Sequence, residues 1–279
     1  MAMNPIVTQS NADSLFAGAN LHPLTDTIPT ALIITEATKG GTVEGDSPYA
    51  RVPFVDDVDA SVVGEGKQIT AVDPNLHELH FTTHKIGVIA PYSFETSQNP
   101  TATTLLSASL RRSVLKKADK LFLQGDGLNI KGLGEIENVV DGGSIDGNTG
   151  LDPLLDAIAT VSDNGGNPTS LIMNHGTWAG LVKLKDSSGR YLVPRDSTNT
   201  PTPALFGIPV VLNNNAEQGT VILNDRTQVL AVYSQVRGAT SKDFLFDSDA
   251  LVMRITFRMG FGVPRPNRIA KLTVATSGK

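Results

Sequence analysis

A thin, polar stretch of extended chain sets the strongest limit on how this sequence can fold. Residues 56–86 read as two strands joined by a turn that holds Gly64 and Gly66, and glycine adopts backbone conformations that other residues disfavour. The strand residues mix apolar and polar side chains, and an isolated pair of strands is at best marginally stable. We therefore predict a long two-stranded excursion that has to pack against something outside itself.

The clearest helix follows this excursion, at residues 99–124. Asn99-Pro100 ends the preceding segment, Thr101, Thr103 and Thr104 are possible caps, and Gly125 and Gly127 follow the end of the helix. Its part from 103 to 124, about 22 residues at a rise of 1.5 Å each, gives a rod of roughly 33 Å. The apolar residues that recur at helical spacing are Leu106, Leu110, Val114, Ala118 and Leu121.

Shorter elements surround this helix and give a mixed α+β fold class. Residues 31–35 and 51–55 read as short strands, and residues 251–259 alternate between a buried and a wetter face, as a long strand does. From residue 151 the chain alternates helix and strand. The segments predicted there are a helix from residue 152, a strand at 170–174, a helix at 176–185, and strands at 206–212, 220–223, 228–234 and 269–274.

Composition narrows the classes of function. The chain of 279 residues has no cysteine, which excludes disulfides and thiolate metal sites, and its net charge of −5 argues against a strongly basic nucleic-acid binder. No apolar run approaches the roughly 18 residues of a membrane span, and no secretion signal is recognisable, so we expect a cytoplasmic protein without membrane contact. Charged residues make up 18%, below the usual level of about 25%. Such a surface is typical of a protein that hides much of itself in subunit contacts.

The first 30 residues are polar and rich in small residues. They predict an extended arm with little structure of its own. Two interpretations stay open, a disordered tail and an arm that lies on a neighbouring subunit.

Catalytic and cofactor motifs are absent from the sequence. It has no G-x-S-x-G elbow and no P-loop, and the glycines after the long helix have the wrong spacing for a dinucleotide fingerprint. His77, His80 and His84 could bind a metal if they converged, but the β-prone sequence around them favours a solvated or interface strand. We therefore expect no catalytic site, no metal and no cofactor.

Clusters of like charge have structural explanations as well. The basic residues of the long helix could bind nucleic acid, but no aromatic residues alternate with them, so we favour salt bridges between subunits or a solvated face. Trp178, the only tryptophan, is expected in the core. The acidic clusters at strand edges, where charge discourages wrong pairing, are Asp56, Asp57 and Asp59, and Asp243, Asp247 and Asp249.

The order of these elements resembles the major capsid proteins of tailed bacteriophages, the Hong Kong 97-like fold. The resemblance covers about residues 30–275. The segments that carry it are Arg51-Val52-Pro53, Val63-Gly64-Glu65-Gly66, His84 to Ala90, the long helix, Leu123-Gln124-Gly125-Asp126-Gly127, Leu171-Ile172-Met173-Asn174, Gly189-Arg190-Tyr191-Leu192, Leu205 to Val211, and the closing strand with Arg254 and Arg258.

The resemblance implies how the chain is divided into domains. The long helix would be the spine of a peripheral domain, and the polar excursion would be an extended loop reaching a neighbour. The implied segments are an N-terminal arm at 1–30, the first part of the peripheral domain at 31–55, the extended loop at 56–86, the spine-helix part at 87–150, an axial domain at 151–232 and the return to the peripheral domain at 233–279.

The resemblance also implies the function. The chain would be a structural protein, not an enzyme, that assembles in the host cytoplasm as pentamers and hexamers into the icosahedral shell of a virion and encloses double-stranded DNA. Further partners implied are a portal protein, a possible decoration protein and the packaged DNA through non-specific contact. Residues expected at subunit contacts are Gly64, Glu65, Gly66 and Lys67 at the hairpin tip, and Arg190 and Tyr191 in the axial domain.

Two departures and two alternatives complete the prediction. The arm is too short to be a built-in scaffold, so either the chain is already processed or a separate scaffolding protein directs assembly, and Met1 favours the second option. No Lys–Asn crosslink is predicted at Lys67. One alternative is an encapsulin-like bacterial compartment shell, which shares the fold. The other is an α/β enzyme or metal-binding protein.

Overall fold

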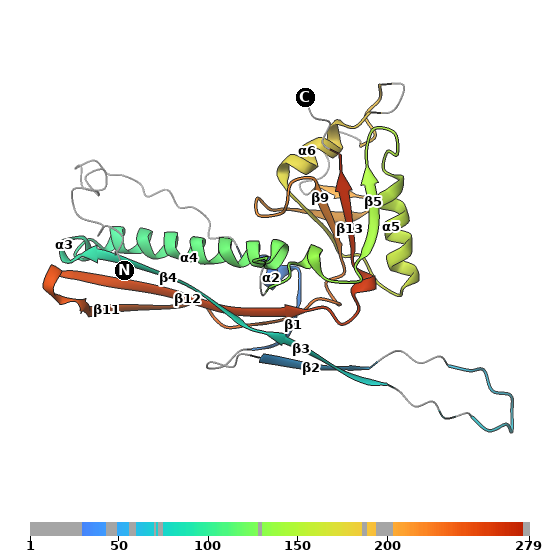
Figure 1. The fold of residues 1–279 in the computed structure, drawn as a ribbon, viewed down its shortest axis with the longest axis horizontal. Coiled ribbons are helices and arrows are strands. Elements are labelled where there is room, and N and C mark those ends of the chain that lie inside the picture. The colour runs from blue at the N-terminus through green and yellow to red at the C-terminus, as the bar shows by residue number, and fades with distance from the viewer. Residues whose placement is uncertain are drawn as a thin grey trace.

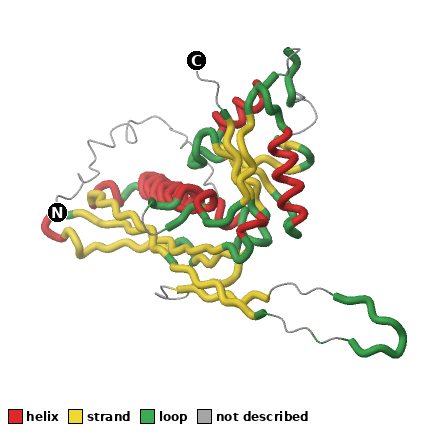
Figure 2. The backbone as a smooth tube through the Cα atoms, turned by 45° about the vertical axis from the view of Figure 1, so that its right-hand side comes forward, coloured by secondary structure: helices red, strands yellow, loops and turns green. Residues whose placement is uncertain are grey.

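The molecule is L-shaped and carries a thin arm at its corner (Figure 1). A five-stranded sheet covered by one long helix forms the lower limb, a six-stranded sheet with two helices forms the upright limb, and a two-stranded arm projects away from the lower limb (Figures 1 and 2). The predicted mixture of helices and sheets is thus confirmed. The computed structural model describes residues 30–42, 49–55, 60–69, 71, 75–127, 130–185, 189–193 and 203–275.

The lower limb is built around its longest strand, β12 (Ala250–Gly262). One edge of β12 pairs with β4 (His84–Ser93), and the other edge pairs first with β11 (Arg237–Leu245) and then with β10 (Leu230–Tyr233). β1 (Thr38–Thr42) runs parallel to β10 and completes the sheet. The predicted alternation of 251–259 is therefore that of the central strand.

A long helix, α4 (Pro100–Gln124), packs along this sheet against β4 and β12. It begins one residue after the predicted start, and its cap is Asn99 instead of one of the predicted threonines. The side chain of Asn99 accepts hydrogen bonds from the backbone N–H groups of Thr101 and Ala102. The helix ends at Gly125, whose φ of 68° favours glycine. Of the predicted apolar face, Leu110, Val114, Ala118 and Leu121 are buried, and Leu106 is partly buried.

The upright limb is a six-stranded sheet with the order β5-β13-β9-β6-β8-β7. Its core includes Leu154 and Val161 of one helix and Leu171 and Leu223 of two central strands, all of them fully buried. The elements of this limb are β5 (Val140–Ile145), α5 (Asp152–Asp163), β6 (Ser170–Met173), α6 (His175–Lys183), β7 (Ala204–Leu205), β8 (Ile208–Leu212), β9 (Thr220–Asn224) and β13 (Ala270–Val274).

The arm begins as a two-stranded antiparallel sheet. β2 (Tyr49–Val55) pairs with β3 (Leu76–Thr82), with Tyr49 opposite Thr82 and Val55 opposite Leu76. The sheet therefore starts before the predicted excursion of 56–86, and the last residues of that range already belong to β4. Short helices elsewhere are α2 (Leu32–Thr35), α3 (Phe94–Ser97), η2 (Leu133–Glu135), η3 (Phe246–Ser248) and η4 (Pro266–Arg268).

Three features differ from the sequence-based expectation. Residues 31–35 were predicted as a strand and form α2 instead, because the cluster of apolar residues there packs against α4 as one helical turn. β5 and β13 both lie in the six-stranded sheet, although 140–145 and 270–274 were assigned to the peripheral domain. Conversely, β10 lies in the five-stranded sheet, although 230–232 was assigned to the axial domain. Alternation identifies a strand but not its partner, which explains the two differences that concern strands.

The predicted N-terminal arm at 1–30 falls outside the described residues, apart from Thr30. Within the described part of the chain, no helix combines the length and the apolar character needed to cross a membrane.

Candidate functional site

The root of the arm is fixed to the end of the lower limb. The Arg265 guanidinium donates a hydrogen bond to the Val55 carbonyl oxygen at 2.7 Å. Gly262 lies so close to the arm that a Cβ there would stand 2.8 Å from side-chain atoms of Leu79 and Phe81. A groove of about 530 Å³ opens beside this contact, between β3, the end of β12 and the loop around Ile130. The direction of the arm is thus set by packing at its root.

From its root to its tip the arm carries exposed apolar side chains. Leu76 is 76% exposed and Ile69 is 74% exposed, and Val62 has no shielding. Tyr49 and Val55 of β2 are exposed as well. Isolated exposed apolar residues are common, but several on one thin projection are typical of a surface that contacts a partner.

The tip of the arm is a tight turn. The Lys67 backbone N–H donates to the Gly64 carbonyl oxygen at 3.1 Å, and Glu65 and Gly66 form the bend. Gly66 has a φ of 74°, which favours glycine, and no atom lies within 4 Å of where its Cβ would be. The predicted contact residues Gly64, Glu65, Gly66 and Lys67 therefore lie together, exposed, at the far end of the arm.

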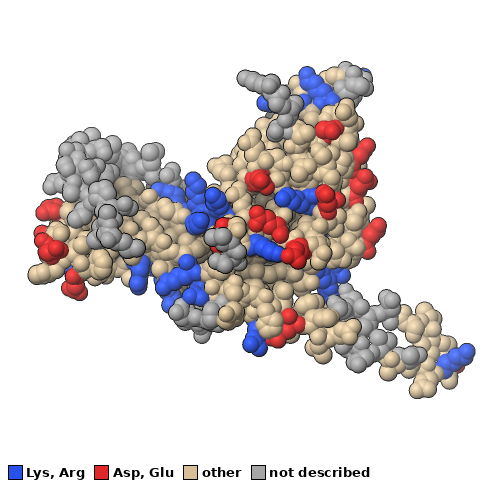
Figure 3. Space-filling model, in the orientation of Figure 1, with Lys and Arg blue, Asp and Glu red and all other residues tan. Residues whose placement is uncertain are grey.

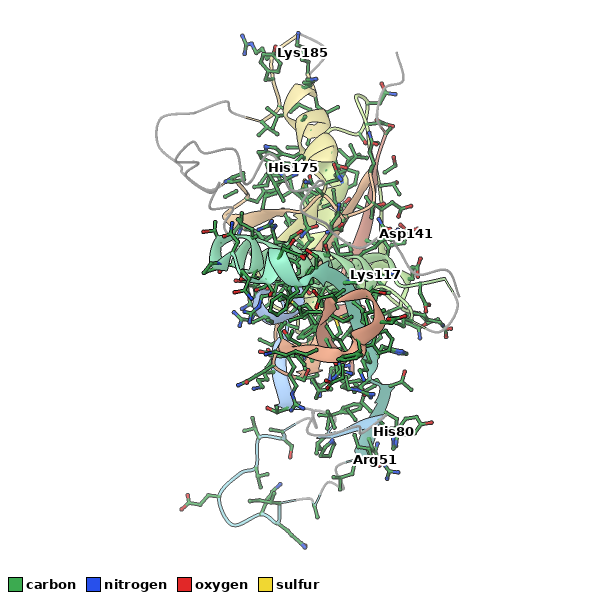
Figure 4. The ribbon with its side chains drawn as sticks, turned by 90° about the vertical axis from the view of Figure 1, so that its left-hand side faces the viewer. Arg51, His80, Lys117, Asp141, His175 and Lys185 are labelled. Atoms are coloured by element: carbon green, nitrogen blue, oxygen red, sulfur yellow. The ribbon has the colours of Figure 1, made fainter. Side chains whose placement is uncertain are left out.

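The other predicted contact residues lie at the top of the upright limb. Tyr191 pairs with Lys185 in an isolated bridge, and the Lys185 ammonium nitrogen lies 5.0 Å from the centroid of the Tyr191 ring. Arg190 is exposed next to it. Figure 4 shows Lys185 at the opposite end of the molecule from Arg51 and His80, which lie at the arm root. The predicted site residues therefore form two separate surfaces.

A buried carboxylate holds the corner between the two limbs. One oxygen of Asp119, on α4, accepts a hydrogen bond from the Leu32 backbone N–H at 2.7 Å, and the other accepts from the Asn213 side-chain amide at 3.0 Å. Burial raises the pKa of Asp119, and these two hydrogen bonds oppose part of that rise. Sequence reasoning missed this residue. Its signal was a lone acid beside Ala118 on the apolar side of a basic helix.

The residues considered for metal binding make separate contacts. The His77 ring stacks on Phe54 with 5.3 Å between centroids, His80 Nε2 lies 3.2 Å from a Glu78 oxygen, and His84 Nε2 lies 2.9 Å from the Thr82 hydroxyl. Among the residues the structure describes, no group of three His, Asp or Glu side chains converges as a metal site would require. A solvated or interface strand stays the prediction for the segment that carries these histidines.

The acidic clusters also divide. Asp56, Asp57 and Asp59 lie outside the described residues. Asp243, Asp247 and Asp249 are exposed at the turn between β11 and β12, the far end of the lower limb. Trp178 is partly buried and packs against the core of the upright limb, as expected.

Both the sequence and the fold of this chain resemble those of known proteins. A model of the phage capsid family matches residues 33–274. The fold is similar to a solved structure from Gordonia phage Cozz, at 16% identity and a TM-score of 0.71 over 99% of this chain and 96% of that one. It is also similar to one from Mycobacterium phage Adephagia, at 13% identity and a TM-score of 0.71 over 99% of this chain and 100% of that one.

A third similar structure is the capsid of an empty GTA particle, at 15% identity and a TM-score of 0.69 over 98% of this chain and 100% of that one. No curated protein matches the chain.

Proposed function

We propose that copies of this chain join as pentamers and hexamers through the projecting arm. The premise is that the chain belongs to the phage capsid family and is a major capsid protein that forms a phage shell. The family supports a structural role, and we assign the chain no reaction. The encapsulin-like alternative is not favoured, since the similar structures described above belong to phages and a GTA particle.

The observation that carries this proposal is the uncovered apolar surface of the arm. Burying a Val, Leu or Ile side chain contributes about 1.5–3 kcal/mol, so Val62, Ile69 and Leu76 together offer several kcal/mol. Joining two proteins costs about 4–15 kcal/mol in lost translation and rotation. The free energy gained by burying one arm is therefore close to the cost of association. A subunit that makes several such contacts at once is held stably.

The arm and the body are different surfaces, which determines the kind of assembly. A contact between unlike surfaces of identical subunits is heterologous, and it closes into a ring when the rotation between neighbours permits. We propose that the arm tip, Gly64 to Lys67, contacts a neighbouring subunit. Arg190 and Tyr191, at the top of the upright limb, would lie at the centre of the ring. In this proposal the upright limb is the axial domain and the lower limb is the peripheral domain.

Other partners belong to the same proposal. The shell would be icosahedral, assemble in the host cytoplasm with a separate scaffolding protein and a portal, accept a decoration protein, and enclose double-stranded DNA through non-specific contacts. The family and the capsids of similar fold support the shell and the virion location.

Electron microscopy and sedimentation of the purified protein, alone and with its scaffolding protein, test this function. We expect closed particles of uniform diameter and, before closure, rings of five and six subunits. A protein that remains a monodisperse monomer under both conditions would overturn the proposal.

A further inference from the structure

The exposed side of α4 carries positive charge without a partner in the described part of the chain. Lys116, Lys117 and Lys120 are exposed and lie within about a third of the helix circumference, because each residue turns the helix by about 100°. The one acid of this helix, Asp119, is buried and bonded to Leu32 and Asn213. None of the three lysines makes an ion pair within the described residues. We call these three lysines the α4 stripe.

The exposed side of α5 carries the opposite charge. Asp152, Asp156 and Asp163 are exposed and follow one another at spacings of four and seven residues, so they share one face of the helix. Leu155, beside them, is 44% exposed. The opposite face of α5 packs on the six-stranded sheet through buried apolar residues. We call the three aspartates and Leu155 the α5 face.

The two surfaces lie on opposite sides of the upright limb. Figure 3 shows basic side chains over α4 in the inner corner of the L and acidic side chains along the outer edge formed by α5. The arm projects on the same side as α5 (Figure 1). A neighbour placed on that side therefore meets the arm and the α5 face together.

We propose that the α5 face of one subunit docks on the α4 stripe of the next subunit in the ring. This inference rests on the proposed ring assembly and identifies the partner surfaces of one contact. Opposite charges attract in this arrangement, whereas a contact between two α4 stripes or between two α5 faces places like charges together. An exposed ion pair contributes little by itself, so the charges mainly select direction and register, while the arm and Leu155 supply apolar contact.

A polyanion such as DNA is the competing occupant of the α4 stripe. Both occupants would account for the lysines, but only a second copy also accounts for the acidic face on the opposite flank. The two predict different outcomes when the charges on both helices are exchanged.

Charge exchange tests the contact. We would compare wild type with Lys116→Glu/Lys120→Glu, with Asp156→Lys/Asp163→Lys, and with the variant that combines all four changes and has the net charge of wild type. Asp152 is kept, because a negative charge in the first turn stabilises the helix. Each double variant alone should lower the yield of rings and shells about tenfold or more, because the attraction between the two helices is lost at every contact in the ring. The combined variant should recover most of the yield.

Two further samples make the result specific. An equimolar mixture of the two pair variants should recover even-numbered rings, because alternating subunits match at every contact. The matched control joins Lys116→Glu/Lys120→Glu to Asp243→Lys/Asp247→Lys, which restores net charge at the far end of the lower limb and should remain defective. Circular dichroism and thermal melting should show every subunit folded.

The outcomes separate this inference from the proposed function. Wild type that forms no rings or shells contradicts the ring assembly itself. Wild type that assembles together with unaffected pair variants, or with rescue by the distant control, overturns the inference. Normal shells of Lys116→Glu/Lys120→Glu that retain less DNA would overturn it in favour of the polyanion.

Discussion

The arm and the upright limb are both made of β-strands, but the surroundings of their strands differ completely. Every residue of β6 and β9 is buried between neighbouring strands and helices. The residues of β2 alternate between exposed and half-buried, and β3 is mostly exposed. Apolar side chains occur in both regions. One region completes its core within the chain, whereas the other leaves apolar side chains such as Ile69 and Leu76 exposed.

Removing the arm is expected to have the largest effect and tests this difference between the two regions. Replacing residues 58–80 with a short flexible linker should abolish shells and leave a soluble body with nearly unchanged thermal stability, because the arm adds little to the core. Electron microscopy and calorimetry measure the two effects. Replacing the exposed polar residues Ser61 and Gln68 with Ala should leave assembly intact. Normal shells from the deletion would contradict the account.

Matched leucine substitutions sharpen the same comparison. Leu223→Ala in β9 should lower the free energy of unfolding by about 2–5 kcal/mol, because it opens a cavity in a full core. Leu76→Ala in the arm should change it by less than about 0.5 kcal/mol while reducing shell yield, since Leu76 is 76% exposed. Denaturant titration of the subunit and particle yield are the measurements. A loss of subunit stability at Leu76 comparable to that at Leu223 would mean that the arm folds as part of the body.

A smaller effect is expected at the tip of the arm. Gly66→Val places a branched side chain at a φ of 74°, which costs about 1–2 kcal/mol locally. Because the tip packs on nothing in the subunit, we expect melting to change little and assembly to slow. The matched control is Gly127→Val, since Gly127 has a φ of 73° and open space around it but lies off the arm. Equal assembly defects in both variants would show that the tip has no special role.

The smallest effect concerns the corner that joins the limbs. Burial raises the pKa of Asp119, so the carboxyl group binds its proton more tightly in the folded chain than in the unfolded chain. The stabilisation is complete below the usual pKa of 3.8 and is lost as pH rises through the raised folded pKa. Asp119→Asn removes this pH-dependent part and also loses the hydrogen bond from Asn213 at every pH.

The pH dependence of subunit unfolding measures this effect. Between pH 4 and neutrality, the stability of wild type should fall relative to that of Asp119→Asn. A constant difference across this range would show that the carboxyl does not titrate as its burial indicates.

Local signals predicted the elements better than their partners. The α4 helix was predicted almost to the residue, because Asn99, Pro100 and Gly125 encode its ends in neighbouring residues. The strand at 270–274 was recognised, but its place between β5 and β9 was not, since pairing depends on segments more than forty residues away. α2 was taken for a strand, because four apolar or β-branched residues fit either structure.

The candidate surfaces divide in the same way. The arm and its glycine turn could be predicted, because a polar pair of strands cannot form a core. The corner at Asp119 could not, since its meaning depends on Leu32 and Asn213, far away in sequence. The α4 lysines were visible as a basic stripe, but only the fold shows that they and the aspartates of α5 lie on opposite sides of the upright limb.

Amide hydrogen exchange, measured in isolated subunits and in assembled shells, tests most directly whether the arm acquires its partner from another copy. The account predicts rapid exchange at β2 and β3 in subunits and strong protection in shells, with β9 protected equally in both. Arm amides already as protected in the free subunit as in the shell would contradict it.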